Sequence, residues 1–200
     1  MALFGEVGYR GASLREIAAR CGMSHPGLLH HFPTKESLLL AVLERRDRED
    51  AGHLASEGPT GLEGLRRMVE LVARNVTRRP IVELFTVLSA EATSSDHPAH
   101  AYFVRRYEVT RDLTRASYVA AHDAGVLREG IDPDAAARGL VAVLDGLQLQ
   151  WLLDDGATDM VAVVVAHIEA QLTVPLGVPL GAVVAPADPV TPAGAAGHDG

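Results

Sequence analysis

The sequence predicts an all-α protein with an N-terminal helix-turn-helix three-helix head and a larger helical body. Three observations predict this class. Apolar residues recur at intervals of three and four in most segments. Capping residues, prolines and glycines separate these segments. Sustained two-residue alternation is absent from the sequence, so we expect no sheet. We assign the head to residues 1–48, the body to 49–173, and a flexible tail rich in proline, glycine and alanine to 174–200.

The segment 13–32 predicts two short helices joined by a tight turn. Ser13 and Glu16 have the spacing of a capping box, so the first helix should begin at Leu14. Gly22 supplies the left-handed turn that follows. Ser24 then caps the second helix. The side chains expected to face inward are Leu14, Ile17, Ala18, Cys21, Met23, Leu28 and Phe32.

Two helices of this length and spacing form the unit that places a recognition helix in the DNA major groove. Pro26 fits the first turn of that recognition helix, where its missing N–H is least costly. Cys21 is the only cysteine, which excludes an internal disulfide. We interpret it as a small buried residue rather than a redox sensor.

The segment from Gly8 to Asp47 resembles the DNA-binding head of TetR/AcrR-type transcription regulators. The resemblance rests on Gly8-Tyr9, the helix-turn-helix, and the F-x-x-K-E-x-L-L pattern from Phe32 to Leu39. The alternative is a pair of packed helices with no role in DNA binding. A match over about forty residues in order makes that alternative much weaker.

The resemblance implies a double-stranded DNA partner and assigns contact positions in the head. Lys35, the only lysine, matches the family's phosphate-binding lysine, and Thr34 caps its helix. Gly27 and Leu29 stand where the family often has hydroxyl side chains, so we place specificity in the histidines. The expected DNA-binding residues are Arg15, Ser24, His25, Pro26, Gly27, Leu29, His30, His31, Thr34 and Lys35.

The charge is distributed unevenly, although the net charge is −8. Residues 1–48 hold seven basic and five acidic side chains, whereas the remainder holds eleven and twenty-one. An acidic body repels DNA and leaves the head as the attractive surface. Because the head is only weakly basic, we expect DNA affinity to depend on two heads that bind the same duplex together.

The start of the sequence reads as the last turns of a helix that ends at Gly8, so the first helix of the head looks shortened relative to the resembled family. The shortened start, together with Gly27 and Leu29, keeps a second hypothesis open. In that hypothesis the chain is a ligand-binding or dimerisation protein of the same fold with weakened or lost DNA binding.

The body should contain five helices, after a long helix over 34–50 that connects it to the head. The first of them should begin at the capping box of Thr60 and Glu63, and Pro80 should end it after Arg79. The others are expected at about 81–93, at 98–124, from Pro133, and at 158–172. The last two are apolar on more than one side, and in the resembled family they form a four-helix homodimer interface. The residues expected there are Leu140, Leu144, Leu147, Met160, Val164 and Ile168; the alternative is that they fill one monomer core.

The resemblance also implies a pocket for an unknown small-molecule effector between the body helices. The expected lining residues are Phe85, Leu88, Tyr102, Phe103, Tyr107, Tyr118 and Trp151, each of which could equally be plain core. His97 and His100 are better explained as a surface cap than as a metal pair. No nucleophile–base pair, phosphate loop or zinc motif stands out, so we expect no enzyme, no catalytic residues and no cofactor.

The sequence has neither a membrane-length apolar run nor a secretory leader, so we expect a cytoplasmic protein associated with the nucleoid. The function implied by the resemblance is a ligand-responsive regulator, usually a repressor. It would bind a palindromic operator as a homodimer and leave it when a small molecule binds.

Overall fold

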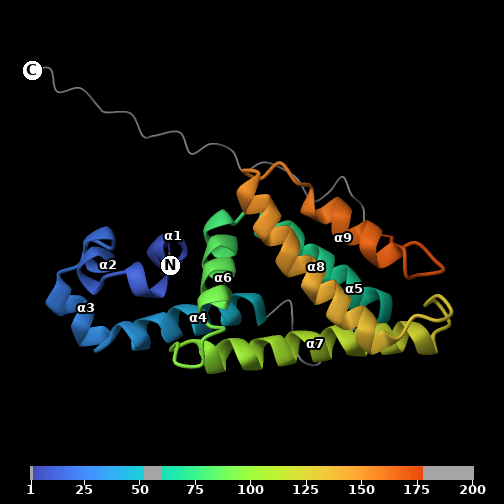
Figure 1. The fold of residues 1–200 in the computed structure, drawn as a ribbon, viewed down its shortest axis with the longest axis horizontal. Coiled ribbons are helices and arrows are strands. Elements are labelled where there is room, and N and C mark those ends of the chain that lie inside the picture. The colour runs from blue at the N-terminus through green and yellow to red at the C-terminus, as the bar shows by residue number, and fades with distance from the viewer. Residues whose placement is uncertain (1, 52–59, 178–200) are drawn as a thin grey trace, which may run out of the picture.

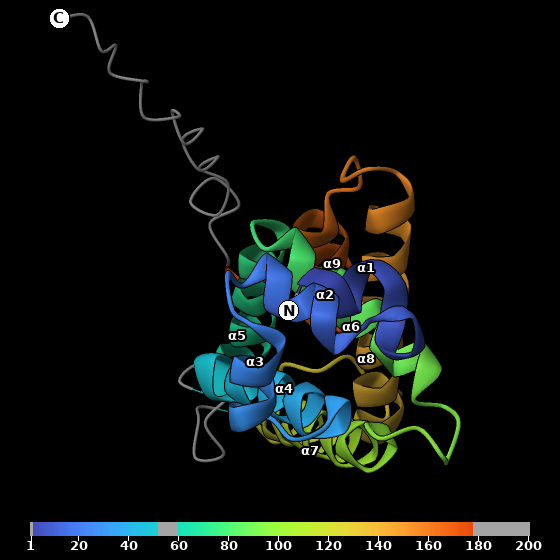
Figure 2. The same cartoon turned by 90° about the vertical axis from the view of Figure 1, so that its left-hand side faces the viewer.

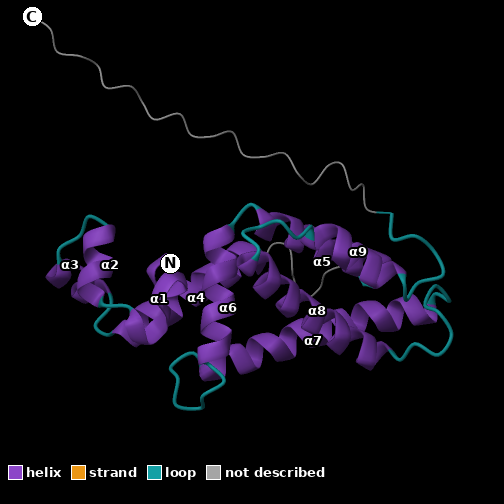
Figure 3. Cartoon of the chain, turned by 45° about the horizontal axis from the view of Figure 1, so that its top comes forward, coloured by secondary structure: helices purple, strands orange, loops and turns teal. Residues whose placement is uncertain are grey.

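The computed structural model describes residues 2–51 and 60–177, and these ranges fold into nine helices. Apart from an isolated bridge between Leu127 and Leu172, the described residues contain no β-structure, which confirms the all-α prediction (Figure 3). The helices are α1 (Ala2–Gly11), α2 (Leu14–Arg20), α3 (His25–His31), α4 (Lys35–Ala51), α5 (Gly61–Val76), α6 (Arg79–Glu91), α7 (His100–Asp123), α8 (Pro133–Leu153) and α9 (Met160–Glu169).

The helices are arranged along one long axis. Figure 1 shows α1, α2 and α3 at one end and α5, α8 and α9 toward the other, with α7 running beneath the body. Helices α4 and α6 lie between the two ends. Seen from the head, α1 lies in front of α6, against which it packs (Figure 2).

The local signals of the head act largely as the sequence predicts. The Ser13 hydroxyl accepts from the Glu16 N–H (3.2 Å), and the Ser24 hydroxyl accepts from the Gly27 N–H (3.1 Å). Gly22 has a φ of 65°, which favours glycine. The capping box is only half formed, because the Glu16 carboxylate pairs with Arg20 instead.

The inward face of the head is smaller than predicted. Ala18 and Leu28 are buried, but Cys21 is exposed and Met23 is 37% exposed, so both are corrections. The physical reason is the length of α2. It ends at Arg20, and therefore Cys21 and Met23 belong to the turn rather than to a helical face.

Two hydrophobic cores hold the molecule together, and α6 belongs to both. Val82 packs in the body core with α5, α8 and α9. Leu84 and Leu88 pack in the head core with Leu3, Phe4 and other residues of α1 to α4. The physical head therefore includes part of α6 and the start of α7, although the sequence separates it from the body near residue 48.

The residues predicted to form a dimer interface lie instead within one subunit's core. Leu140, Leu147, Met160, Val164 and Ile168 are buried in the body core, and Leu144 packs against it. That part of the prediction is wrong, because these side chains pack against α5 and each other. The alternative, one monomer core, describes them correctly.

Two boundaries also differ from the prediction. Pro80 lies in the first turn of α6 instead of ending α5, which ends at Val76. The body continues past residue 173, because Leu176 is fully buried and its carbonyl accepts from Arg66 Nε at 2.6 Å. The rest of the predicted tail, 178–200, lies outside the described residues.

No helix among the described residues is both long enough and apolar enough to cross a membrane.

Candidate functional site: a helix-turn-helix surface and a body cavity

The recognition helix α3 presents polar side chains to solvent. Pro26, His30 and His31 are exposed, and His25 and Leu29 are half-buried. The rings of His30 and His31 meet edge to face, with centroids 5.4 Å apart. A Cβ on Gly27 would come within 3.0 Å of the Ser24 hydroxyl, so glycine suits the first turn of this helix. The histidines are the side chains of this helix that carry both donor and acceptor atoms, the kind of group that can read base edges.

Lys35 joins three segments of the head. Its ammonium donates to the Ala12 carbonyl at 3.0 Å and lies 4.5 Å from the centroid of the Tyr9 ring. Thr34 and Ser37 cap each other reciprocally, which fixes the start of α4 beside it. Lys35 also donates to the Arg10 carbonyl at 3.5 Å, and it thus holds the turn between α1 and α2 against α4.

The arginines of the helix-turn-helix differ in their availability. Arg15 is exposed on α2. Arg20 is bound to the Glu6 and Glu16 carboxylates at 2.6 and 3.1 Å, so its charge is already balanced within the head. Arg15 is therefore the more available of the two for an anionic partner.

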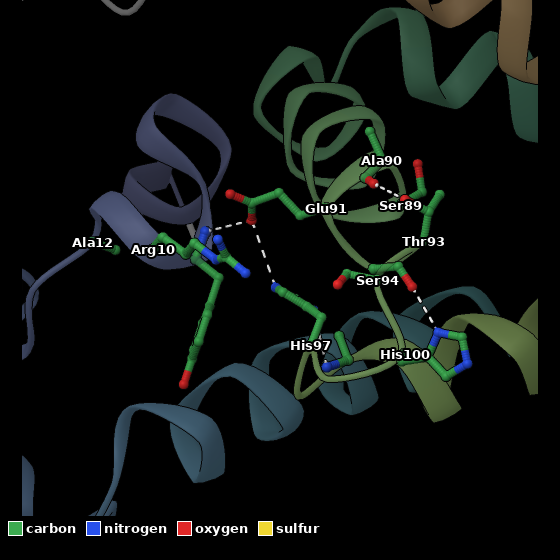
Figure 4. A network of polar contacts seen from close by, with 12 residues as sticks. Arg10, Ala12, Ser89, Ala90, Glu91, Thr93, Ser94, His97 and His100 are labelled. Carbon is green, nitrogen blue, oxygen red and sulfur yellow. Dashed lines mark hydrogen bonds and ion pairs between the residues drawn. The ribbon is translucent and has the colours of Figure 1, made fainter.

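The head is fastened to the body where α1 meets the end of α6 (Figure 4). The Tyr9 backbone N–H donates to Glu91 Oε2 at 2.7 Å. Gly8 has a φ of 69° and kinks α1 there, in agreement with the predicted end of the helix. A Cβ on Gly8 would lie 2.8 Å from the Glu91 carboxyl carbon, and one on Gly5 would lie 3.0 Å from the Leu84 nitrogen. Both glycines permit the close approach of α1 to α6.

His97 and His100 complete this junction. His97 is buried, which corrects the expectation of a surface cap. Its Nδ1 accepts from the Ala99 N–H (3.2 Å), and its Nε2 lies 3.6 Å from Glu91 Oε2. Burial lowers the pKa of His97, and the Glu91 carboxylate partly opposes that shift. The Nδ1 of His100 lies 2.8 Å from the Ala92 carbonyl oxygen.

The body holds a partly open cavity of about 580 Å³ between α4, α5, α6, α7 and α8. This volume is in the range of ligand pockets. Of the predicted lining residues, Phe85, Phe103 and Tyr107 line it. The other four do not: Leu88 and Tyr102 belong to the head core, and Tyr118 and Trp151 to the body core. Aromatic spacing cannot separate a cavity wall from a core, because both require apolar faces.

Sequence reasoning missed the polar groups of the cavity. Arg46 and Arg106 lie against the Phe85 ring, with guanidinium carbons 4.1 and 4.5 Å from its centroid. Arg106 also pairs with Asp47 of α4. Arg46 sits within a run of charged residues that the sequence presents as a solvated helix end, and it is nevertheless 2% exposed.

A second polar pair joins α7 to α8. The Tyr107 hydroxyl donates to Asp145 Oδ2 at 2.9 Å, linking α7 to α8. Desolvation raises the pKa of Asp145, against the effect of the Tyr107 hydrogen bond. Burial, together with the nearby Asp145 carboxylate, raises the pKa of Tyr107 to about 12.

Across residues 2–51 and 60–177 the structure holds no cluster of three or more His, Cys, Asp or Glu side chains that could bind a metal ion.

A helix-turn-helix head joined to a helical body that holds a pocket is the arrangement expected of a DNA-binding regulator. Comparison with known proteins identifies the family. The family profile described as "Bacterial regulatory proteins, tetR family" matches residues 1–42, and the profile described as "BetI-type transcriptional repressor, C-terminal" matches residues 61–173. The chain belongs to the TetR family of bacterial regulatory proteins, and it is a helix-turn-helix transcription regulator.

Curated relatives agree with this assignment. The HTH-type transcriptional repressor AcnR of Corynebacterium diphtheriae is 29% identical over 168 residues, which cover 83% of each chain. The HTH-type transcriptional regulator UidR of Escherichia coli is 26% identical over 159 residues, 79% of this chain and 78% of the relative. These relatives are transcription regulators rather than enzymes.

Solved structures share the fold. One, described as "Molecular basis for control of antibiotic production by a bacterial hormones", is 31% identical with a TM-score of 0.64, covering 86% of this chain and 92% of the other. AibR in complex with isovaleryl coenzyme A and operator DNA is 25% identical with a TM-score of 0.66, covering 84% and 91%. The SmeT–triclosan complex, at 22% identity and a TM-score of 0.70 over 93% of each chain, supports the fold alone.

Proposed function

We propose that this chain is a repressor that binds a palindromic operator as a homodimer and leaves it when a small molecule occupies the body cavity. The proposed DNA contacts are the ten head residues predicted from the sequence. The regulator acts at the nucleoid in the cytoplasm. A relative solved with both an acyl coenzyme A and operator DNA supports a link between the two sites.

The observation that carries this proposal is that α6 contributes side chains both to the cavity and body core and to the head core. Phe85 lines the cavity, and Leu88, one turn further on, packs in the head core. Glu91, at the end of the same helix, accepts the Tyr9 N–H of the head. A ligand that displaces Phe85 therefore acts on a helix that also positions α1, and a two-state movement of α6 would couple cavity and head.

The dimer surface follows from the apolar side chains of α8 and α9 that remain exposed. Leu153 is 78% exposed on α8, and Ala142 and Leu149 share its face at helical spacing. On α9, Val163 and Ala166 are exposed at a spacing of three. Small residues allow close helix packing, and a two-fold interface uses the same surface on both subunits. We place the interface on this surface instead of on the six residues predicted from the sequence.

The direct test is selection of bound duplexes from a random DNA pool, with the oligomeric state measured by light scattering. We expect an inverted repeat and a dimer. Leu153→Glu should yield monomers that lose enrichment, whereas Val109→Glu, a change at another exposed apolar site (57% exposed, on α7), should leave both the dimer and the enrichment unchanged. A folded dimer that enriches no sequence would overturn the proposal and favour the second hypothesis, a ligand-binding or dimerisation protein without DNA binding.

A further inference from the structure

We propose that the cavity binds a small amphipathic acid, with its carboxylate at Arg46 and Arg106, its apolar part along the middle, and a hydrogen-bond donor at Asn75. The inference deepens the proposed function, because it names the chemical class of the effector. Binding of the acid is nevertheless measurable without DNA.

The first pole of the cavity is cationic. Arg46 of α4 and Arg106 of α7 both contribute to the lining and both contact the Phe85 ring. A guanidinium stays protonated at every physiological pH and presents a planar fork that matches a carboxylate. An ionic contact inside an apolar cavity is stronger than one in water. This pole therefore favours an anionic group.

The second pole is a buried acceptor. Asn75 of α5 is 6% exposed, and its Oδ1 is buried with no hydrogen-bond partner. The same residue lines the cavity together with Leu144 and Gln148. A buried acceptor without a partner is costly, and a hydroxyl or N–H of a ligand would remove that cost. The Asn75 Oδ1 therefore favours a ligand with a hydrogen-bond donor at this position, and it does not favour a second charged group.

Much of the remaining lining is apolar. Met68, Leu71, Val141 and Leu144 contribute aliphatic surface from α5 and α8. Such a wall accepts an alkyl chain or a ring and gains free energy with each buried methylene. Asp145 is a weaker attractor for a cationic ligand than a free carboxylate, because its Oδ2 already accepts the Tyr107 hydroxyl.

An acid at the cationic pole would change the contacts of α4. Arg106 is paired with Asp47, which lies on α4 directly beside Arg46. A ligand carboxylate would compete with Asp47 for Arg106 and loosen the ionic link between α7 and α4. Because α4 begins at Lys35 in the head, the exchange would reach the DNA-binding surface as well as α6.

The test is calorimetric titration of the full chain with hexanoate, octanoate and decanoate, each against the alcohol and the amine of equal length. We expect an acid to bind about tenfold tighter than its alcohol, the effect of roughly one charge-assisted contact. The amine should bind more weakly than either. Equal or tighter binding of the alcohol or amine, or no binding of any acid, would overturn the proposal.

Three variants assign the poles. Arg106→Gln should remove the preference for the acid over the alcohol, whereas Arg105→Gln, its exposed neighbour, should keep it. Asp47→Asn should tighten acid binding severalfold without changing the alcohol, a gain that misfolding cannot produce. An ω-hydroxy acid should bind tighter than the plain acid to the wild type and lose that advantage in Asn75→Leu. An unchanged affinity for the acid in Asp47→Asn would refute the contact between the carboxylate and Arg106. No advantage of the ω-hydroxyl in the wild type would refute the contact with Asn75.

Failure of this inference can be separated from failure of the proposed function. If the selected duplex binds but the acids do not, the effector class is wrong and the repressor assignment stands. If the acids bind and no duplex is selected, the cavity assignment stands and the DNA-binding proposal falls.

Discussion

Replacing Gly8 with alanine should destabilise the junction between head and body by two separable effects. The first is backbone strain, because Gly8 has a φ of 69° and a ψ of −179°, a region that essentially only glycine adopts. Strain of this kind costs about 1–3 kcal/mol. The second is displacement of the Glu91 carboxylate by the new Cβ, which would break its contact with the Tyr9 N–H. Leaving a partly buried donor without an acceptor costs about 1–3 kcal/mol more.

A double-mutant cycle separates the two effects. Glu91→Ala alone should lose the Tyr9 hydrogen bond together with the 3.6 Å contact to His97, and adding Gly8→Ala to it should then cost only the strain. The two changes should therefore be non-additive by about 1–3 kcal/mol. The measurement is urea unfolding at one fixed protein concentration, since dimerisation makes apparent stability concentration-dependent. Gly125→Ala, also at a φ of 69° but with open space around it, is the control for a substitution at positive φ that displaces no neighbour. Additivity of Gly8→Ala and Glu91→Ala would refute the reasoning.

Three further predictions concern the core, the junction and the DNA surface. Leu88→Ala should lower the free energy of unfolding by about 2–5 kcal/mol, because Leu88 is fully buried, and Val109→Ala, at an exposed site, should change it little. Because burial lowers the pKa of His97, the folded state resists its protonation; that part of the stability is complete above about pH 6.5 and is lost as the pH falls below it. His97→Asn keeps an acceptor near Nδ1 and should flatten the acid side of a pH–stability curve; an identical curve would contradict this assignment. Lys35→Ala should weaken binding to all duplexes by a similar factor and reduce the salt slope by about one, whereas Arg128→Ala on the body should leave binding unchanged.

Local signals of the sequence predicted the helices well because their causes are local. Ser24, Gly22 and Pro133 act within one turn of chain, so caps and turns were recognisable without tertiary contacts. The resemblance of the head to a known family carried the assignment of α2 and α3. The burial predicted for Cys21 and Met23 was wrong because it depended on where α2 ends, and periodicity alone does not fix the end of a helix.

The cavity and the dimer surface were harder to predict, because apolar spacing describes a buried face without saying what covers it. Leu140 and Leu147 have the same periodicity whether they meet α5 of their own chain or a second subunit. Arg46 lies in a run of charges that suggests solvent, and only the fold places its guanidinium beside Phe85. Functional polar groups of this kind are set by tertiary neighbours separated by about forty residues or more in the sequence.

The sharing of α6 between two cores limits how the chain can be divided. A fragment ending near residue 48 would lack Leu84 and Leu88, and would expose the apolar surfaces of α1 and α4 that these leucines cover. A chimera that exchanges only the first 48 residues with a relative would set foreign side chains against the Gly5 and Gly8 contacts with α6. Regulators with exchanged DNA specificity would therefore be better built by replacing the surface of α3 alone, or by moving α6 together with the head.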